Sequence, residues 1–143
     1  MLPHAAAHRA VVVVDTNVLV SAFLTPDGPC GTVFRWCAAH HEEWLATPTI
    51  IAEYERVLLR PCFGFKAATV QSLVALLNEI ALDDVEPVGQ SVPGASREDM
   101  QFYAVAVRYG ARHLVTGNVK HYPTSCAQVK VVLPREYVTA LET

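Results

Sequence analysis

The stretch VVVVDTNVLVSAFL, residues 11–24, decides the fold of this 143-residue chain. Its first four residues form an apolar, β-branched run without polar alternation, which is typical of a strand buried on both faces of a parallel sheet. Asp15 ends this run, and Thr16 and Asn17 can cap the helix that the following apolar residues predict. We therefore expect a first and central strand that leads directly into a helix.

The rest of the chain continues this alternation of short strands and helices, which predicts an α/β domain with helices on both faces of a central, mostly parallel sheet. In such sheets the functional residues lie at the carboxyl ends of the strands. We expect one domain over residues 1–143, with residues 1–9 as a flexible N-terminal segment. Strands are expected at 44–47, 83–88, 113–116 and 129–133, and helices at 29–41, 49–61, 66–82, 96–110 and after Pro134.

Composition limits the class of protein. Hydrophobic residues make up 52% of the chain, but its longest apolar stretch, residues 10–24, is short and carries Asp15 and Asn17. The net charge of −3 argues against a broad basic surface that grips duplex DNA. No leader pattern precedes the first strand, and the four cysteines show no CxxC pairing. We expect a cytoplasmic protein with no membrane partner.

Three acidic residues are candidates for chemistry. Asp15 follows the buried strand, where a charge is costly unless a cation or hydrogen bonds meet it, although an aspartate there can also cap the helix. Glu53 lies in the first turns of the next helix, where a solvated glutamate is the ordinary interpretation. Asp99 follows Ser96 in the pattern of a capping box. Taken singly, none of the three indicates a site.

Their combined context is more specific, because four motifs occur in order: DTNVLVSAFL at 15–24, IIAEYERVL at 50–58, REDMQFYAVAV at 97–107 and LVTGNVKHY at 114–122. On these motifs the chain resembles the PIN domain from about Val11 to Leu141, in the subgroup described as toxin components of bacterial toxin–antitoxin pairs. The resemblance implies a three-layer α/β/α fold and a metal-dependent endoribonuclease. It also implies an antitoxin protein as partner and a homodimer.

Carried over to this sequence, the family's acids fall on Asp15, Glu53 and Asp99 as catalytic residues and as ligands of Mg²⁺ or Mn²⁺. Hard oxygen ligands of this kind suit both ions. Family members often have a fourth acid after the strand that ends in LVTG, and this chain has Asn118 there. A neutral oxygen at that place should hold a second metal ion more weakly. Glu98 is a poor substitute, because it points about 100° away from Asp99 around a helix.

Several polar residues surround the expected site. Those expected to support the acids are Thr16, Asn17, Thr116 and Asn118. Lys120 and His121 are candidates for contact with an RNA phosphate, and Tyr103 and Tyr122 for stacking on bases of a single strand.

Two other interpretations stay open. A phosphatase or receiver domain also has an aspartate after its first strand, but the phosphatase requires a second aspartate where Asn17 stands, and the receiver requires an acidic pair ahead of its site. A catalytically weakened PIN domain that acts as an RNA- or protein-binding module is favoured by the missing fourth acid. The RNA target and the identity of an antitoxin leave no mark in the sequence.

Overall fold

The computed structural model describes residues 11–87, 95–123 and 128–142. The N-terminal segment 1–9, expected to be flexible, lies outside these ranges. The strands are β1 (Val12–Val14), β2 (His113–Val115) and β3 (Lys130–Val132). The α-helices are α2 (Thr16–Leu24), α3 (Pro29–Ala39), α4 (Pro48–Leu58), α5 (Ala67–Ile80), α6 (Arg97–Tyr109) and α7 (Pro134–Leu141). Short 3₁₀ turns occupy His41–Glu43 and Val119–His121.

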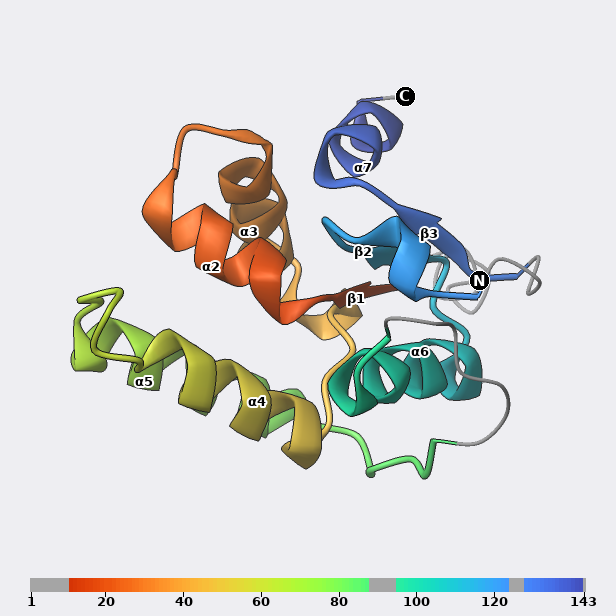
Figure 1. Ribbon diagram of the computed structural model, residues 1–143, viewed down its shortest axis with the longest axis horizontal. Helices are drawn as coiled ribbons and strands as arrows, with labels where there is room; N and C mark the ends of the chain where they lie inside the picture. Colours follow the sequence, from red (N-terminus) through yellow and green to blue (C-terminus); the bar gives the residue numbers. More distant parts are fainter. Residues whose placement is uncertain (1–10, 88–94, 124–127, 143) are drawn as a thin grey trace, which may run out of the picture.

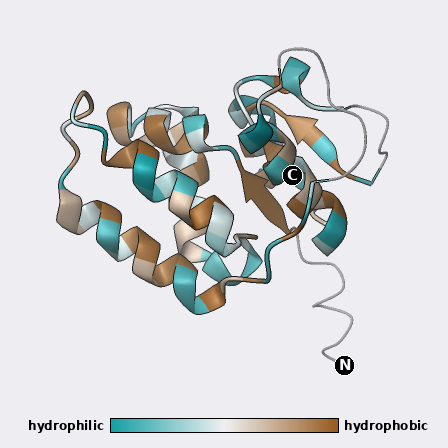
Figure 2. Cartoon of the chain, turned by 60° about the horizontal axis from the view of Figure 1, so that its bottom comes forward, coloured by the Kyte–Doolittle hydropathy of each residue, from teal (hydrophilic) through white to brown (hydrophobic). Residues whose placement is uncertain are grey.

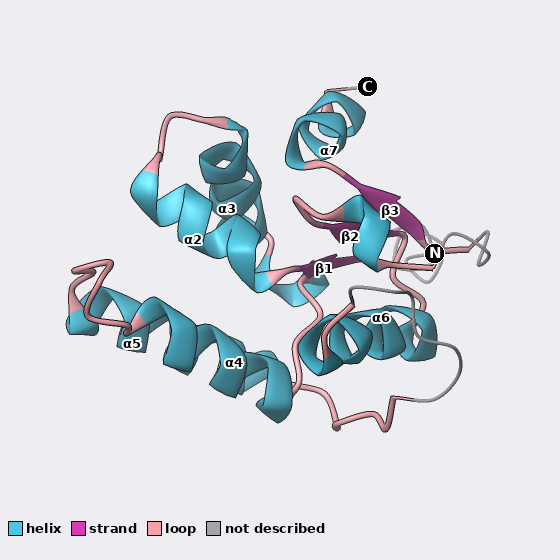
Figure 3. Ribbon diagram, in the orientation of Figure 1, coloured by secondary structure: helices cyan, strands magenta, loops and turns pink. Residues whose placement is uncertain are grey.

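The three strands form one parallel sheet in the order β1-β2-β3 (Figures 1 and 3). Val13 lies opposite Leu114, which lies opposite Val131, so the strands begin and end together. The expectation that β1 is the central strand is wrong, because β2 lies between the other two. The outer edge of β1 is nevertheless closed, since the Leu45 N–H donates to the Val12 carbonyl at 2.8 Å.

Helices cover both faces of this sheet, as the α/β/α expectation requires. Helix α6 packs against β1 and β2, while α7 packs against β2 and also against α3 (Figure 1). Helices α2 and α3 form a pair, and α4 contacts α2, α5 and α6. Figure 2 shows β1 in the brown of hydrophobic residues, in keeping with its three buried valines. The β-branched run at 11–14 therefore forms the buried strand that its sequence predicts.

Two of the expected strands are wrong. Within 44–47 only Trp44 forms a bridge, to Val12, and no strand follows. Residues 83–87 form no strand either, and Val88 lies outside the described ranges. Side chains hold the second segment in place of a ladder: the Asp84 carboxylate accepts from the Thr49 N–H at 2.9 Å, and the Gln101 amide donates to the Val85 carbonyl at 3.0 Å. A strand-like composition does not specify a pairing partner.

Among the described residues, no helix has both the length and the apolar composition that crossing a bilayer requires.

Candidate active site

The site begins where β1 and β2 end. Because the strands are parallel and in register, Asp15 and Thr116 follow them at the same edge of the sheet. The Asp15 N–H donates to the Val115 carbonyl at 2.9 Å, and the Thr116 hydroxyl donates to Asp15 Oδ2 at 2.7 Å. The sheet thus fixes both the backbone and the carboxylate of Asp15.

Asp15 is a buried acid, with 4% of its surface exposed. Within residues 11–87 its side chain makes no capping hydrogen bond of ordinary geometry to α2, although the backbone N–H of Asn17 lies close enough to lower its pKa. Capping alone therefore does not account for its burial. Burial raises the pKa of this carboxyl above its ordinary value, and the charge of Asp99 raises it further. Hydrogen bonds from Thr116 and Tyr122 lower the pKa in turn. A carboxylate in this position favours a neighbouring cation.

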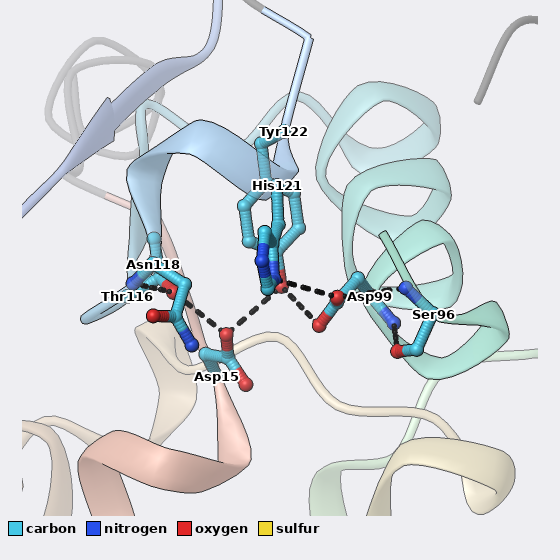
Figure 4. A network of polar contacts seen from close by, with 7 residues as sticks. All are labelled: Asp15, Ser96, Asp99, Thr116, Asn118, His121 and Tyr122. Atoms are coloured by element: carbon cyan, nitrogen blue, oxygen red, sulfur yellow. Dashed lines mark hydrogen bonds and ion pairs between the residues drawn. The ribbon is translucent and has the colours of Figure 1, made fainter. Parts of the chain in front are cut away.

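Asp99 comes from the first turn of α6, where it forms the expected capping box. The Ser96 N–H donates to Asp99 Oδ2 at 2.9 Å, and the Asp99 N–H donates to the Ser96 hydroxyl at 3.0 Å. Asp99 therefore does cap its helix, but the same carboxylate also reaches toward Asp15 (Figure 4). Its Oδ2 lies 3.3 Å from His121 Nδ1. Capping fixes the orientation of the side chain and leaves Oδ1 facing the site.

Tyr122 joins the two acids. Its hydroxyl lies 3.0 Å from Asp15 Oδ2 and 3.4 Å from Asp99 Oδ1 (Figure 4). Both carboxylates are therefore within hydrogen-bond distance of the same hydroxyl oxygen. The expectation that Tyr122 stacks on a base is wrong, because only 2% of its surface is exposed. The sequence motif LVTGNVKHY contains this residue, but nothing in the spacing indicates that the loop turns the ring inward.

The loop that follows β2 supplies the remaining polar residues. The Asn118 N–H donates to the Thr116 hydroxyl at 3.0 Å. The side chain of Asn118 points toward Asp15 (Figure 4). On its other side the loop borders a hollow of about 550 Å³ that Lys120, His121 and Leu133 help to line. His121 thus has one nitrogen on Asp99 and a ring that faces this hollow.

Glu53, the third expected acid, lies on α4. Its side chain is 17% exposed and forms an ion pair with Arg56 on its own helix. It lines a cavity of about 80 Å³ between α4 and α6, together with residues that include Arg97 and Glu98. No hydrogen bond or ion pair of the described residues connects it to Asp15 or Asp99. The structure therefore brings two of the three expected acids together, and the third stays a prediction.

The donor set at the acid pair suits a hard cation. Besides the two carboxylates, Thr16 Oγ1 and Asn17 Oδ1 are buried and have no hydrogen-bond partner among the described residues. Asn17 Oδ1 faces the loop, since a Cβ added at Gly117 would lie 3.9 Å from it. Buried oxygens without donors are the ligands that Mg²⁺ and Mn²⁺ take. Across 11–87, 95–123 and 128–142, however, no three His, Cys, Asp or Glu side chains are grouped closely enough to hold a metal by themselves.

Comparison with known proteins agrees with this geometry. A sequence model described as a PIN domain matches residues 11–120, which include Asp15, Glu53, Asp99 and Asn118. PIN domains are generally nucleases, and they typically use divalent metal ions. A search of curated proteins found no match to the chain.

Proposed function

The chain belongs to the PIN domain family, and we propose that it is a Mg²⁺- or Mn²⁺-dependent endoribonuclease that hydrolyses RNA phosphodiesters. The observation that carries the proposal is the meeting of Asp15 and Asp99 at the carboxyl edge of the sheet, within hydrogen-bond distance of one hydroxyl. A buried carboxylate at Asp15 with the partly exposed Asp99 carboxylate so close to it is destabilising unless a cation neutralises the charge. A purely structural capping role would not require the Asp15 carboxylate to be buried close to a second carboxylate.

The residues that would hold the ion are Asp15 and Asp99, with Asn17 and Thr16 as further oxygen donors. When bound, such an ion neutralises charge on the scissile phosphate and makes a nearby water more acidic. Thr116 holds Asp15 by a hydrogen bond to Oδ2, which leaves Oδ1 for other contacts. Ser96 holds Asp99 in the same manner at its Oδ2. We assign Glu53 to the site as a third acid, and this requires its side chain to leave Arg56.

Lys120 and His121 are the candidate contacts for RNA. They border the hollow beside the acid pair, which is wide enough for part of a nucleotide. A cationic side chain there would position a phosphate without reading the base. A narrow acidic site of this kind suits a single-stranded or looped RNA better than a rigid duplex.

The biological context is proposed from the motifs alone. We infer that the enzyme is a cytoplasmic homodimer and the toxin of a toxin–antitoxin pair, inhibited by a small cognate protein. Expression of the chain by itself should then arrest growth, and expression of Asp15→Asn should not. Equal growth with both proteins would contradict the toxin role and leave the nuclease proposal standing.

Cleavage of a mixed single-stranded RNA pool tests the enzyme proposal. We expect cuts with Mg²⁺ or Mn²⁺ that EDTA abolishes, and a loss of at least about 100-fold in rate for both Asp15→Asn and Asp99→Asn. Asp27→Asn is the matched control, because Asp27 is exposed and lies between α2 and α3. Circular dichroism should show that all variants are folded. Cleavage that survives either substitution would refute this site.

The second candidate is a binding module that no longer cleaves. Asn118 in place of a fourth acid and the pairing of Glu53 with Arg56 favour it. The same pool distinguishes the two functions, because a module would bind RNA in a gel shift and leave it intact with either metal.

A further inference from the structure

The hydroxyl of Tyr122 lies between the two acids in a nearly dry environment. Asp15 and Tyr122 are both buried, and the hydroxyl lies within 3.0 Å of Asp15 Oδ2 and 3.4 Å of Asp99 Oδ1. A tyrosine hydroxyl has an ordinary pKa of about 10. The phenol therefore keeps its proton, and it remains a hydrogen-bond donor at any physiological pH.

A phenol has one hydrogen, so it can donate to only one of the two carboxylates at a time. Neither acid depends on it alone, because Asp15 Oδ2 also accepts from Thr116 and Asp99 Oδ2 accepts from Ser96. What the hydroxyl adds is a shared point of contact between side chains that come from β1 and α6. Two negative charges would otherwise repel across this gap.

We propose that Tyr122 is a positioning residue of the acid pair, whose hydroxyl holds the Asp15 and Asp99 carboxylates facing each other and so sets the geometry in which a divalent cation meets them. This inference rests on the metal-dependent function proposed above. The contribution comes from preorganisation, since a site assembled in advance loses less entropy when its ligand binds. Nothing in the PIN family match assigns a role to this residue, because the matched region ends at residue 120.

The Tyr122 hydroxyl could instead oppose cation binding, and its removal would then have the opposite effect on cation affinity. A hydroxyl between two carboxylates could compete with a cation for the same oxygens, and its removal would then strengthen cation binding. A purely structural role would alter the stability of the fold and leave the cation affinity unchanged. Measurement of affinity and stability in the same variants separates these three cases.

The test uses the full chain stripped of metal, with Mn²⁺ as the probe. Electron paramagnetic resonance of free Mn²⁺ gives the affinity, and the shift of the melting temperature in excess Mn²⁺ checks it. Tyr122→Phe keeps the ring and removes the hydroxyl, so we expect Mn²⁺ to bind about tenfold more weakly. Tyr137→Phe is the matched control, because Tyr137 is also buried and its hydroxyl has no partner among the described residues. Its Mn²⁺ affinity should equal that of the wild type.

Two further variants show whether Tyr122 acts through the acids. The loss caused by Tyr122→Phe should largely disappear in an Asp99→Asn background, because one carboxylate alone has nothing to be aligned with. Incorporation of p-aminophenylalanine at position 122 keeps the ring and a donor at the place of the hydroxyl, and we expect that protein to bind Mn²⁺ within about threefold of the wild type. If Tyr122→Phe fails to fold, a loss of tenfold or more in the folded protein with p-aminophenylalanine refutes the proposal.

Equal or tighter Mn²⁺ binding by folded Tyr122→Phe would overturn the positioning role, and the nuclease proposal would remain. Absence of Mn²⁺ binding by the wild type itself would instead refute the proposed metal site and this inference with it. The wild-type titration therefore distinguishes the two failures.

Discussion

At the scale of single residues, Asp15 shows how the site differs from an ordinary helix start. Aspartate is among the best capping residues, and it stabilises a helix by about 1 kcal/mol when its side chain accepts a backbone N–H. Asp15 makes no such bond of ordinary geometry, and the side chains of Thr116 and Tyr122 hold its carboxylate. Its pKa is raised because the carboxylate is buried and near Asp99. Burial of this carboxylate therefore destabilises the metal-free fold, which supports the proposed role as a metal ligand.

His113 gives the protein a pH-dependent stability that is independent of the acids. Its Nδ1 is buried without a partner among the described residues, and the ring packs edge-on against Tyr137 of α7. Burial lowers the pKa of this histidine, and the charges of Lys130, opposite it on β3, and of Arg112 lower it further. Val12, its neighbour on β1, carries no charge.

The direction in which pH changes the stability follows from how many protons the folded and unfolded chains bind. The unfolded chain binds a proton near pH 6.5 and the folded chain only at lower pH, so the free energy of unfolding rises as pH increases through that window. We expect His113→Gln to flatten the increase in melting temperature between pH 5 and 7, measured as the difference from the wild type. His40→Gln, at an exposed position, should leave the profile unchanged. A profile that is equally steep in His113→Gln would show that other groups cause it.

The sequence predicted the two acids of the site but not their connection. Asp15 and Asp99 could be found because each follows a local pattern, a buried strand and a capping box, that also occurs in the family motifs. Tyr122 was assigned the wrong role, since its inward orientation depends on the path of a loop with no periodic pattern. Glu53 forms an ion pair with Arg56, three residues away on the same helix, and this spacing was visible in the sequence.

At the scale of elements, the turn between α2 and α3 depends on a close backbone approach. A Cβ at Gly31 would lie 1.9 Å from the Pro26 carbonyl oxygen, whereas one at Gly28 would meet its nearest atoms at 3.5 Å. Alanine favours a helix over glycine by about 1 kcal/mol, but the clash should outweigh this gain. We expect Gly31→Ala to lower the free energy of unfolding in urea by about 2 kcal/mol.

Gly28→Ala is the control for the turn, and it should change the free energy of unfolding by less than about 0.5 kcal/mol. A Gly31→Ala protein as stable as the wild type would mean that α2 and α3 can separate without cost.

The elements themselves were largely predictable, for reasons that also explain the errors. Every predicted helix forms, because amphipathic spacing and caps such as Thr47, Ser96 and Gly110 are local features. Segments 44–47 and 83–88 were mistaken for strands, because a strand requires a partner that local sequence does not reveal. The same limit led to the expectation that β1, and not β2, is the central strand.

At the scale of the whole molecule, a net charge of −3 restricts how the proposed ribonuclease would bind RNA. Without a broad basic surface, a few local cations must make the phosphate contacts. Each contact with a single strand changes the slope of log affinity against log salt by about 0.7. We expect Lys120→Gln to reduce that slope by about 0.7, measured by fluorescence anisotropy in the Asp15→Asn background so that the RNA stays intact.

Lys66→Gln is the matched control, because Lys66 is exposed and precedes α5, in a different part of the chain. An equal reduction in both variants would mean that RNA responds only to total charge and does not lie beside the acid pair.

The hydrogen bond between Leu45 and Val12 also affects the tendency of the chain to aggregate. The run at 11–14 is apolar, β-branched and uncharged, which is the composition of segments that stack into amyloid-like fibres. In the folded protein, Trp44 and Leu45 pair with the edge of β1 that faces away from β2. Another chain therefore cannot add a strand at that edge. A substitution that loosens this short connection would expose the edge of β1 to pairing with another chain.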